Sequence, residues 1–122
     1  MALNVSSERR GDVLVLALTG ELDIYTVPSF RETVDRLAKD EPGIVLDLEA
    51  VSLIDSSGLG ALVSLANQVG ERDAELGLLC PQQSLRRVFE ITGLRRAFSF
   101  GTTFDELTVA MDRAREGTSN PA

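Results

Sequence analysis

Residues 51–63 read VSLIDSSGLGALV, and this stretch decides the fold. An apolar run ends in one aspartate, two serines and two glycines, after which the chain turns apolar again. The second apolar run has helical spacing, which predicts an amphipathic helix from about Ser56 to Gly70. Asp55, Ser56 and Ser57 therefore lie where a strand meets a helix, and one of the three is expected to cap that helix.

Strands and helices are predicted on both sides of this junction. Apolar segments rich in branched residues and bounded by glycine or proline predict strands, which cover residues 3–9, 12–19, 43–48, 74–80 and 97–100. Segments with helical spacing predict helices, which cover about residues 26–40, 56–70, 82–92 and 103–116. Thr26 is expected to cap the first helix, and Thr103 with Glu106 is expected to form a capping box on the last.

The order of these elements predicts an α/β fold. The segment between the strands at 43–48 and 74–80 has a length suited to a right-handed crossover, which makes those strands parallel. A turn at Gly11 joins the first two strands as a hairpin. We therefore predict a mixed β-sheet with a parallel core and an antiparallel N-terminal hairpin, with about four α-helices packed on it. Residues 1–116 are expected to form one domain, and residues 117–122 a disordered tail.

The composition excludes several classes of function. The chain has 12 Lys and Arg against 19 Asp and Glu, and its net charge of -7 argues against direct nucleic-acid binding. It contains no histidine, which excludes Ser-His and Cys-His nucleophiles and histidine-ligated metals. Its single cysteine, Cys80, lies in an apolar segment and is expected to be a buried thiol. Without a signal-peptide stretch or a membrane-length apolar run, we expect a cytoplasmic protein with no membrane insertion.

The serine and glycine stretch fits no cofactor loop. Its two glycines, Gly58 and Gly60, lack the third glycine of a dinucleotide-binding loop, and no lysine follows them as in a phosphate-binding loop. A nucleophile elbow would need a histidine partner. We therefore expect no cofactor and no enzymatic activity. Two interpretations remain for the junction: a capped helix whose small residues pack on the sheet, or a serine whose phosphorylation repels a docked partner.

Three segments together resemble a known family. They are LALTGELD at 16–23, IVLDLEAVSLIDSSGLGAL at 44–62 and LRRVFEITGLRRAF at 85–98. With these segments the chain resembles the anti-sigma factor antagonists, members of the STAS domain family. The resemblance covers most of the chain, and it implies a mixed sheet with helices on one side.

The resemblance also implies a partner-switching mechanism. Ser56 would be phosphorylated by an anti-sigma factor that is itself a serine kinase, and ATP and magnesium would belong to that kinase. The unphosphorylated antagonist would bind the anti-sigma factor and free the sigma factor; phosphorylation would break the complex, and a serine phosphatase would reset it. The partner interface implied by the resemblance comprises Asp23, Asp55, Ser57, Gly58, Leu59 and Gly60.

An alternative function is a constitutive STAS adaptor, for example a subunit of a lipid-transport or signalling complex, in which the serine only caps a helix. The sequence leaves the oligomeric state open between a monomer and a weak dimer. Tyr25 follows the GELD segment and is a further candidate for the interface. Four arginines flank the third helix, and we expect them to be solvated, with a basic edge for a partner as the alternative; they are Arg86, Arg87, Arg95 and Arg96.

Overall fold

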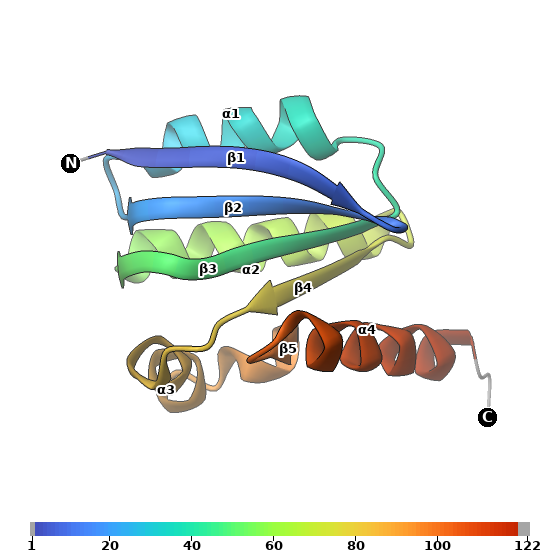
Figure 1. The fold of residues 1–122 in the computed structure, drawn as a ribbon. Coiled ribbons are helices and arrows are strands. Elements are labelled where there is room, and N and C mark those ends of the chain that lie inside the picture. The colour runs from blue at the N-terminus through green and yellow to red at the C-terminus, as the bar shows by residue number, and fades with distance from the viewer. Residues whose placement is uncertain (1, 120–122) are drawn as a thin grey trace.

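The computed structural model describes the backbone of residues 2–119 and the side chains of residues 2–114 (Figure 1). The strands are β1 (Leu3–Arg10), β2 (Val13–Leu22), β3 (Gly43–Ile54), β4 (Glu75–Leu79) and β5 (Ser99–Gly101). The helices are α1 (Val27–Ala38), α2 (Ser56–Glu71), α3 (Gln83–Ile91), the short 3-10 helix η1 (Leu94–Ala97) and α4 (Phe104–Ser119). The predicted strands and α-helices are thus confirmed in number and order over the described residues.

The five strands form one sheet in the order β1-β2-β3-β4-β5. β1 pairs with β2 in antiparallel orientation, and the pairs β2–β3, β3–β4 and β4–β5 are parallel. The predicted mixed sheet with an antiparallel N-terminal hairpin is therefore confirmed. Because β2, β3 and β4 are parallel, their carboxyl ends meet at one edge of the sheet, and the serine-containing junction lies at that edge (left in Figure 1).

The helices cover both faces of the sheet, so the expectation of helices on one side is wrong for α4. Alternate strand residues such as Leu16 and Leu46 pack in one core with α1, α2 and α3. The residues between them, Val15 and Val45, pack in a second core with Leu107 and Met111 of α4. Successive side chains of a strand point to opposite faces, so α4 lies across the sheet from the other three helices.

Strand β3 is longer than predicted, and its extension positions the junction. The apolar segment at 43–48 predicts a short strand, but β3 continues in pairing with β2 as far as the pair Leu22 and Ile54. The register shifts twice along this part of the ladder, at the steps from Ala17 to Thr19 and from Gly20 to Glu21. These irregularities interrupt the alternation of buried and exposed residues along this part of β3, so its sequence lacks a clear strand pattern.

Some local predictions need correction. Thr26 stands at the start of α1, but its hydroxyl donates to the carbonyl of Glu21 (2.8 Å) and accepts from the amide of Asp23 (2.9 Å), so it caps no α1 amide. At α4, Thr103 accepts from the amide of Glu106 as predicted (3.1 Å), but the Glu106 carboxylate reaches the amide of Thr102 instead of Thr103.

Two further boundaries differ from the sequence prediction. Residues Leu94–Ala97 form a 3-10 helix, so the last strand begins at Ser99 and not at residue 97. Helix α4 extends to Ser119, three residues into the predicted tail, and residues 120–122 lie outside the described part of the chain.

Cys80 is fully buried, as predicted. Burial raises the pKa of its thiol to about 11, so the thiol is neutral near pH 7. A neutral, inaccessible thiol is a poor nucleophile. Within residues 2–119, none of the helices combines the length and the apolar character that crossing a membrane requires.

Candidate functional site

Asp55, and neither serine, caps α2. The helix begins at Ser56, and the preceding Asp55 has extended backbone angles (φ -91°, ψ -175°). One oxygen of its carboxylate, Oδ1, accepts from the amide of Gly58 at 2.8 Å. Within the described residues, the hydroxyls of Ser56 and Ser57 make no hydrogen bond. Asp55 therefore fills the capping role that the sequence left open among three residues, and Ser56, which is exposed, is not needed for it.

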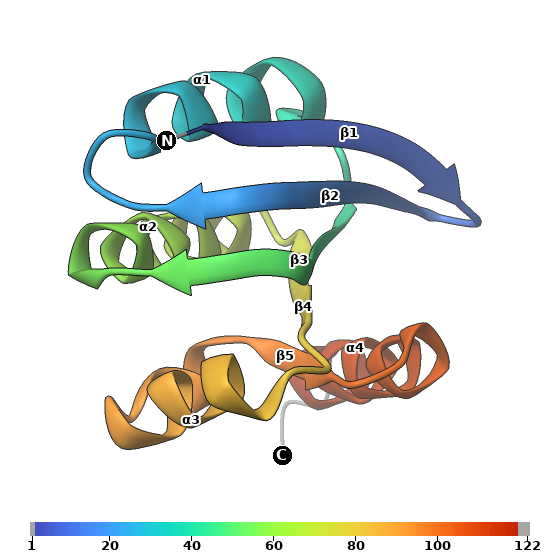
Figure 2. The same ribbon diagram turned by 60° about the vertical axis from the view of Figure 1, so that its left-hand side comes forward.

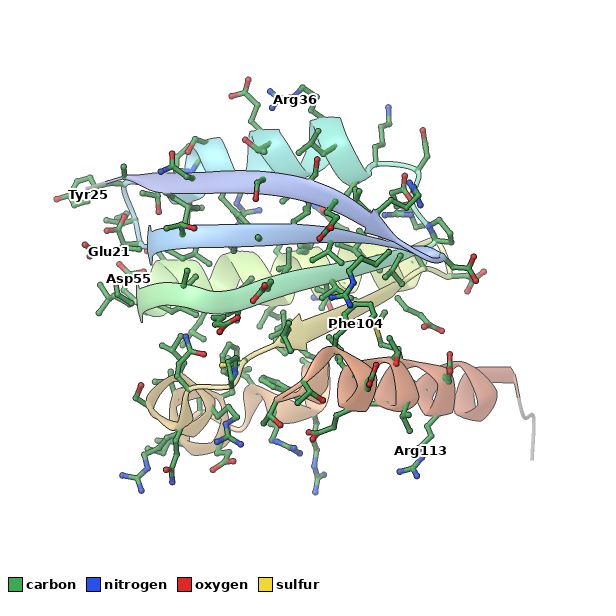
Figure 3. The ribbon with its side chains drawn as sticks, viewed as in Figure 1. Glu21, Tyr25, Arg36, Asp55, Phe104 and Arg113 are labelled. Carbon is green, nitrogen blue, oxygen red and sulfur yellow. The ribbon has the colours of Figure 1, made fainter. Side chains whose placement is uncertain are left out.

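The same aspartate joins two loops. Its second carboxylate oxygen, Oδ2, accepts from the amide of Ile24 at 3.1 Å, and its own amide donates to the carbonyl of Leu22 at 3.2 Å. The β3–α2 junction is thereby bonded to the loop between β2 and α1, over a sequence separation of 31 residues. Figure 3 shows Asp55 and Tyr25 at the same end of the molecule. Residues around Ser56 and residues after β2 thus form one surface.

Asp23 shapes the loop from inside. Only 6% of its surface is exposed. Its carboxylate accepts from the amides of Tyr25 (2.9 Å) and Thr26 (3.0 Å), which closes a tight turn after β2. Sequence reasoning placed Asp23 at the partner interface; the structure gives its carboxylate a scaffolding role, and the side chains that this turn presents to solvent are those of Ile24 and Tyr25.

Three large apolar side chains are exposed around Ser56. They are Ile24 (60% exposed), Tyr25 (83%) and Leu53 (46%), and together with Ser56 we call them the Ser56 surface. Leu53 lies two positions before the capping Asp55, and Ile24 is bonded to that aspartate. Solvent-exposed apolar residues gathered in this way mark protein docking sites. Sequence reasoning missed Ile24 and Leu53, although their large apolar side chains at strand ends were a usable signal.

The remaining predicted interface residues have different roles. Gly58 is buried, and a Cβ atom there would lie 2.3 Å from the carbonyl oxygen of Leu22. Leu59 is half-buried and packs on the main core. Gly60 is exposed, and a Cβ there would meet no atom within 4 Å. Gly58 and the buried part of Leu59 therefore hold α2 against the sheet, and of these three residues Gly60 is the most open to solvent.

Replacing Asp55 by alanine is expected to lower the free energy of unfolding by about 1–2 kcal/mol, because the start of α2 loses its cap. The bond to Ile24 is lost as well, which loosens the loop after β2. Asp55→Asn is the matched control: asparagine keeps an oxygen for the amide of Gly58 and caps helices as well as aspartate does. Urea unfolding measures both variants, and equal losses for the two would contradict the capping role.

The junction is chemically suited to carry a phosphate on Ser56. Its hydroxyl is exposed at the first turn of α2, where amide groups point outward and the helix dipole favours negative charge. Among the described residues, no three His, Cys, Asp or Glu side chains gather in a way that would hold a metal ion. The arrangement is thus an exposed serine hydroxyl at the start of a helix, next to exposed apolar side chains.

Comparison with known proteins places this geometry in a family. The STAS domain profile matches residues 4–110. The chain is 36% identical over 96 residues to an anti-sigma-B factor antagonist of Staphylococcus aureus, an alignment that spans 78% of this chain and 89% of that one. In fold it is similar to an anti-sigma factor antagonist from Mycobacterium paratuberculosis (TM-score 0.81, 27% identity, 91% of this chain and 95% of that one).

A second solved structure is that of a phosphorylated protein. The chain is also similar to the Bacillus cell fate determinant SpoIIAA in its phosphorylated form, with a TM-score of 0.62 and 26% identity over 91% of this chain and 99% of that one. The profile match covers most of the chain, and the S. aureus relative exceeds 30% identity over more than two thirds of it. The chain belongs to the STAS domain family, and within it to the anti-sigma factor antagonists.

Proposed function

We propose that this chain controls a sigma factor by partner switching, with Ser56 as the phosphorylated residue. In the unphosphorylated form, the Ser56 surface binds an anti-sigma factor and thereby frees the sigma factor. Phosphorylation of Ser56 breaks that complex. The observation that carries the proposal is an exposed serine hydroxyl, with no hydrogen bond in the described structure, beside exposed Ile24, Tyr25 and Leu53.

Two features of the site support this assignment to Ser56. Asp55 alone caps α2, so a modification of Ser56 leaves the cap in place. The N-terminal turn of α2 tolerates added negative charge, while a partner seated over it does not. The relatives support the class of function: one is an anti-sigma-B factor antagonist, and one is a structural neighbour in a phosphorylated form.

The proposed partners divide the chemistry among them. The anti-sigma factor acts as the serine kinase and brings ATP and magnesium, and a serine phosphatase removes the phosphate. We place this exchange in the cytoplasm, with no direct contact between this chain and nucleic acid. The chain itself then binds and leaves the anti-sigma factor, and it is the substrate of both the kinase and the phosphatase.

Incubation with the anti-sigma factor kinase of the same organism and ATP is expected to add one phosphoryl group, on Ser56. Mass spectrometry of the digested protein locates it. Ser56→Ala is expected to abolish phosphorylation, and Ser57→Ala, which removes the neighbouring hydroxyl, is expected to retain it. A phosphate on Ser57 in the wild type, or an unchanged level of phosphorylation in Ser56→Ala, would refute the assignment.

A further inference from the structure

Helix α3 and η1 carry a group of arginines that the Ser56 site does not use. Arg86 and Arg87 lie on α3, and Arg95 and Arg96 lie on η1. These are four of the chain's 12 basic residues, and Glu90 is the only acidic residue between the first and the last of them. On a chain with a net charge of -7, this segment is a local concentration of positive charge.

These arginines do not serve the fold through ion pairs. Within the described residues the structure shows one ion pair, Arg9 with Glu41, and none that includes the four arginines. Arg87, Arg95 and Arg96 are exposed, and Arg95 lies over the ring of Phe100 at 5.6 Å. The Nε atom of Arg86 is buried and has no hydrogen-bond partner among the described residues. The charges of Arg87, Arg95 and Arg96 are therefore available to a partner.

An apolar side chain is exposed among them. Ile91 is 76% exposed, whereas Leu85 and Phe89 on the same helix are buried in the core. Ile91 follows Arg87 by one helical turn, so the two side chains share a face of α3. We call Ile91 and the four arginines the arginine surface. Arginine next to an exposed apolar residue is typical of protein interfaces.

The charge of the rest of the molecule decides what can bind there. A nucleic acid and an anionic membrane both present negative charge over an extended length or area, and the acidic remainder of the chain would repel either of them. A short acidic protein segment meets the arginines without extending over that remainder. A protein segment can also include an apolar side chain that covers Ile91, which a row of phosphate groups cannot supply. The chemistry therefore favours an acidic segment of a protein.

The arginine surface lies at the same end of the molecule as the Ser56 surface. β3 and β4 are parallel, so the connections from β3 to α2 and from β4 to α3 leave the sheet at the same edge. Figures 1 and 2 both show α3 at the end where α2 begins. A protein docked at Ser56 can extend along this end to reach α3.

We propose that the arginine surface binds an acidic segment of the same anti-sigma factor that docks at Ser56. This inference rests on the proposed function and adds a second contact to it. The arginines attract the acidic segment during association, and Ile91 is covered once the complex has formed. This contact is remote from the modified serine. It therefore affects the association rate and the orientation of the docked partner, whereas phosphorylation of Ser56 triggers dissociation.

The test compares two double variants with the same change in charge. Arg87→Glu with Arg96→Glu alters the arginine surface. Arg36→Glu with Arg113→Glu alters α1 and α4, where both side chains are exposed and project outward from the molecule (Figure 3). At about 50 mM salt, we expect the first pair to slow association with the anti-sigma factor kinase about tenfold more than the second. At about 500 mM salt, this difference should disappear.

A third variant tests the apolar contact. Ile91→Ser removes an exposed side chain, so it is expected to leave folding intact and to speed dissociation about fivefold. Circular dichroism and thermal unfolding check that all variants are folded. Equal association rates for the two charge pairs at low salt would overturn the inference, and so would an unchanged dissociation rate for Ile91→Ser.

The outcomes separate this inference from the proposed function. If Ser56→Asp weakens binding of the kinase but the two charge pairs behave alike, only the arginine surface is wrong. If wild-type protein does not bind the kinase at all, both proposals fail. Phosphatidylserine vesicles and a single-stranded RNA serve as further probes. The inference would be overturned if the wild-type protein bound either probe, if the Arg87→Glu and Arg96→Glu pair alone abolished that binding, and if the same pair left association with the kinase unchanged. The arginine surface would then bind a polyanion.

Discussion

Phosphorylated Ser56 is expected to bind the anti-sigma factor about a hundredfold more weakly than the free serine, with little change in the stability of the chain itself. The phosphoryl group adds about -1.5 to -2 charges to the Ser56 surface. At an effective dielectric constant near 20, one unit charge about 6 Å from a like charge costs roughly 3 kcal/mol before screening by salt. In the complex, the docked partner excludes water from the Ser56 surface. The phosphate then repels any nearby carboxylate of the partner, and it also repels Asp55, which the partner covers.

The chain itself tolerates the same charge for reasons visible in the structure. Ser56 is exposed at the first turn of α2, where the helix dipole favours an anion. The cap on α2 is made by Asp55, whose oxygens already accept from the amides of Gly58 and Ile24. The modification therefore removes no described hydrogen bond, and binding and stability are expected to respond separately.

Isothermal titration calorimetry of phosphorylated and unphosphorylated protein measures the first effect, and thermal unfolding the second. Ser56→Asp against Ser57→Asp is a matched pair, because both add one negative charge at adjacent positions. Ser56→Asp should weaken binding more, since Ser56 is exposed and Ser57 is half-buried. Equal affinity of phosphorylated and unphosphorylated protein would contradict the switch and would favour a constitutive adaptor.

Gly58→Ala is expected to lower the free energy of unfolding by about 2–3 kcal/mol, whereas Gly60→Ala raises it by about 0.5–1 kcal/mol. At position 58 the added Cβ would lie 2.3 Å from the backbone oxygen of Leu22 and 3.0 Å from a methyl group of Ile54. A backbone oxygen at the end of a strand cannot rotate away as a side chain can, so α2 must move off the sheet. At position 60 the Cβ enters open space, and alanine favours the helix.

Urea denaturation of the two variants, monitored by circular dichroism, checks this difference in sign. The melting temperature of Gly58→Ala should fall by about 10 °C for a domain of this size. A stability of Gly58→Ala within about 0.5 kcal/mol of wild type would show that α2 does not approach β2 as closely as described. Gly60→Ala also tests the partner interface. Because the variant is expected to keep its fold, weaker binding of the anti-sigma factor to it would show that the partner contacts the exposed start of α2.

Much of the fold could be predicted from local patterns. The branched apolar runs at 12–19 and 43–48 predicted strands, and the spacing after Ser56 predicted α2, because these periodicities depend only on neighbours along the chain. The extension of β3 to Ile54 was missed, since its last residues alternate poorly and are held by pairing with β2. The 3-10 helix at Leu94–Ala97 was missed because a single such turn has no extended period to detect.

The two segments of the candidate site could also be found from local patterns, but the contacts between them could not. The DSSG stretch and GELD identify two loops, but nothing in either segment shows that the Asp55 carboxylate accepts from the amide of Ile24. Asp23 illustrates the limit: the resemblance implied a place for it at the partner interface, but only the structure shows that the turn closes around its carboxylate. Burial of a polar group depends on the partners that surround it, and these come from the fold.

By itself, the amino-acid sequence determined the elements and their order, because periodicity and residue type are local properties. Only the tertiary structure decided that α4 crosses to the other face of the sheet, that Gly58 must lack a side chain, and that Asp55 joins two loops beneath an exposed Ser56. Each of these depends on atoms brought together from distant parts of the chain. Packing in three dimensions selects such contacts, and no local pattern encodes them.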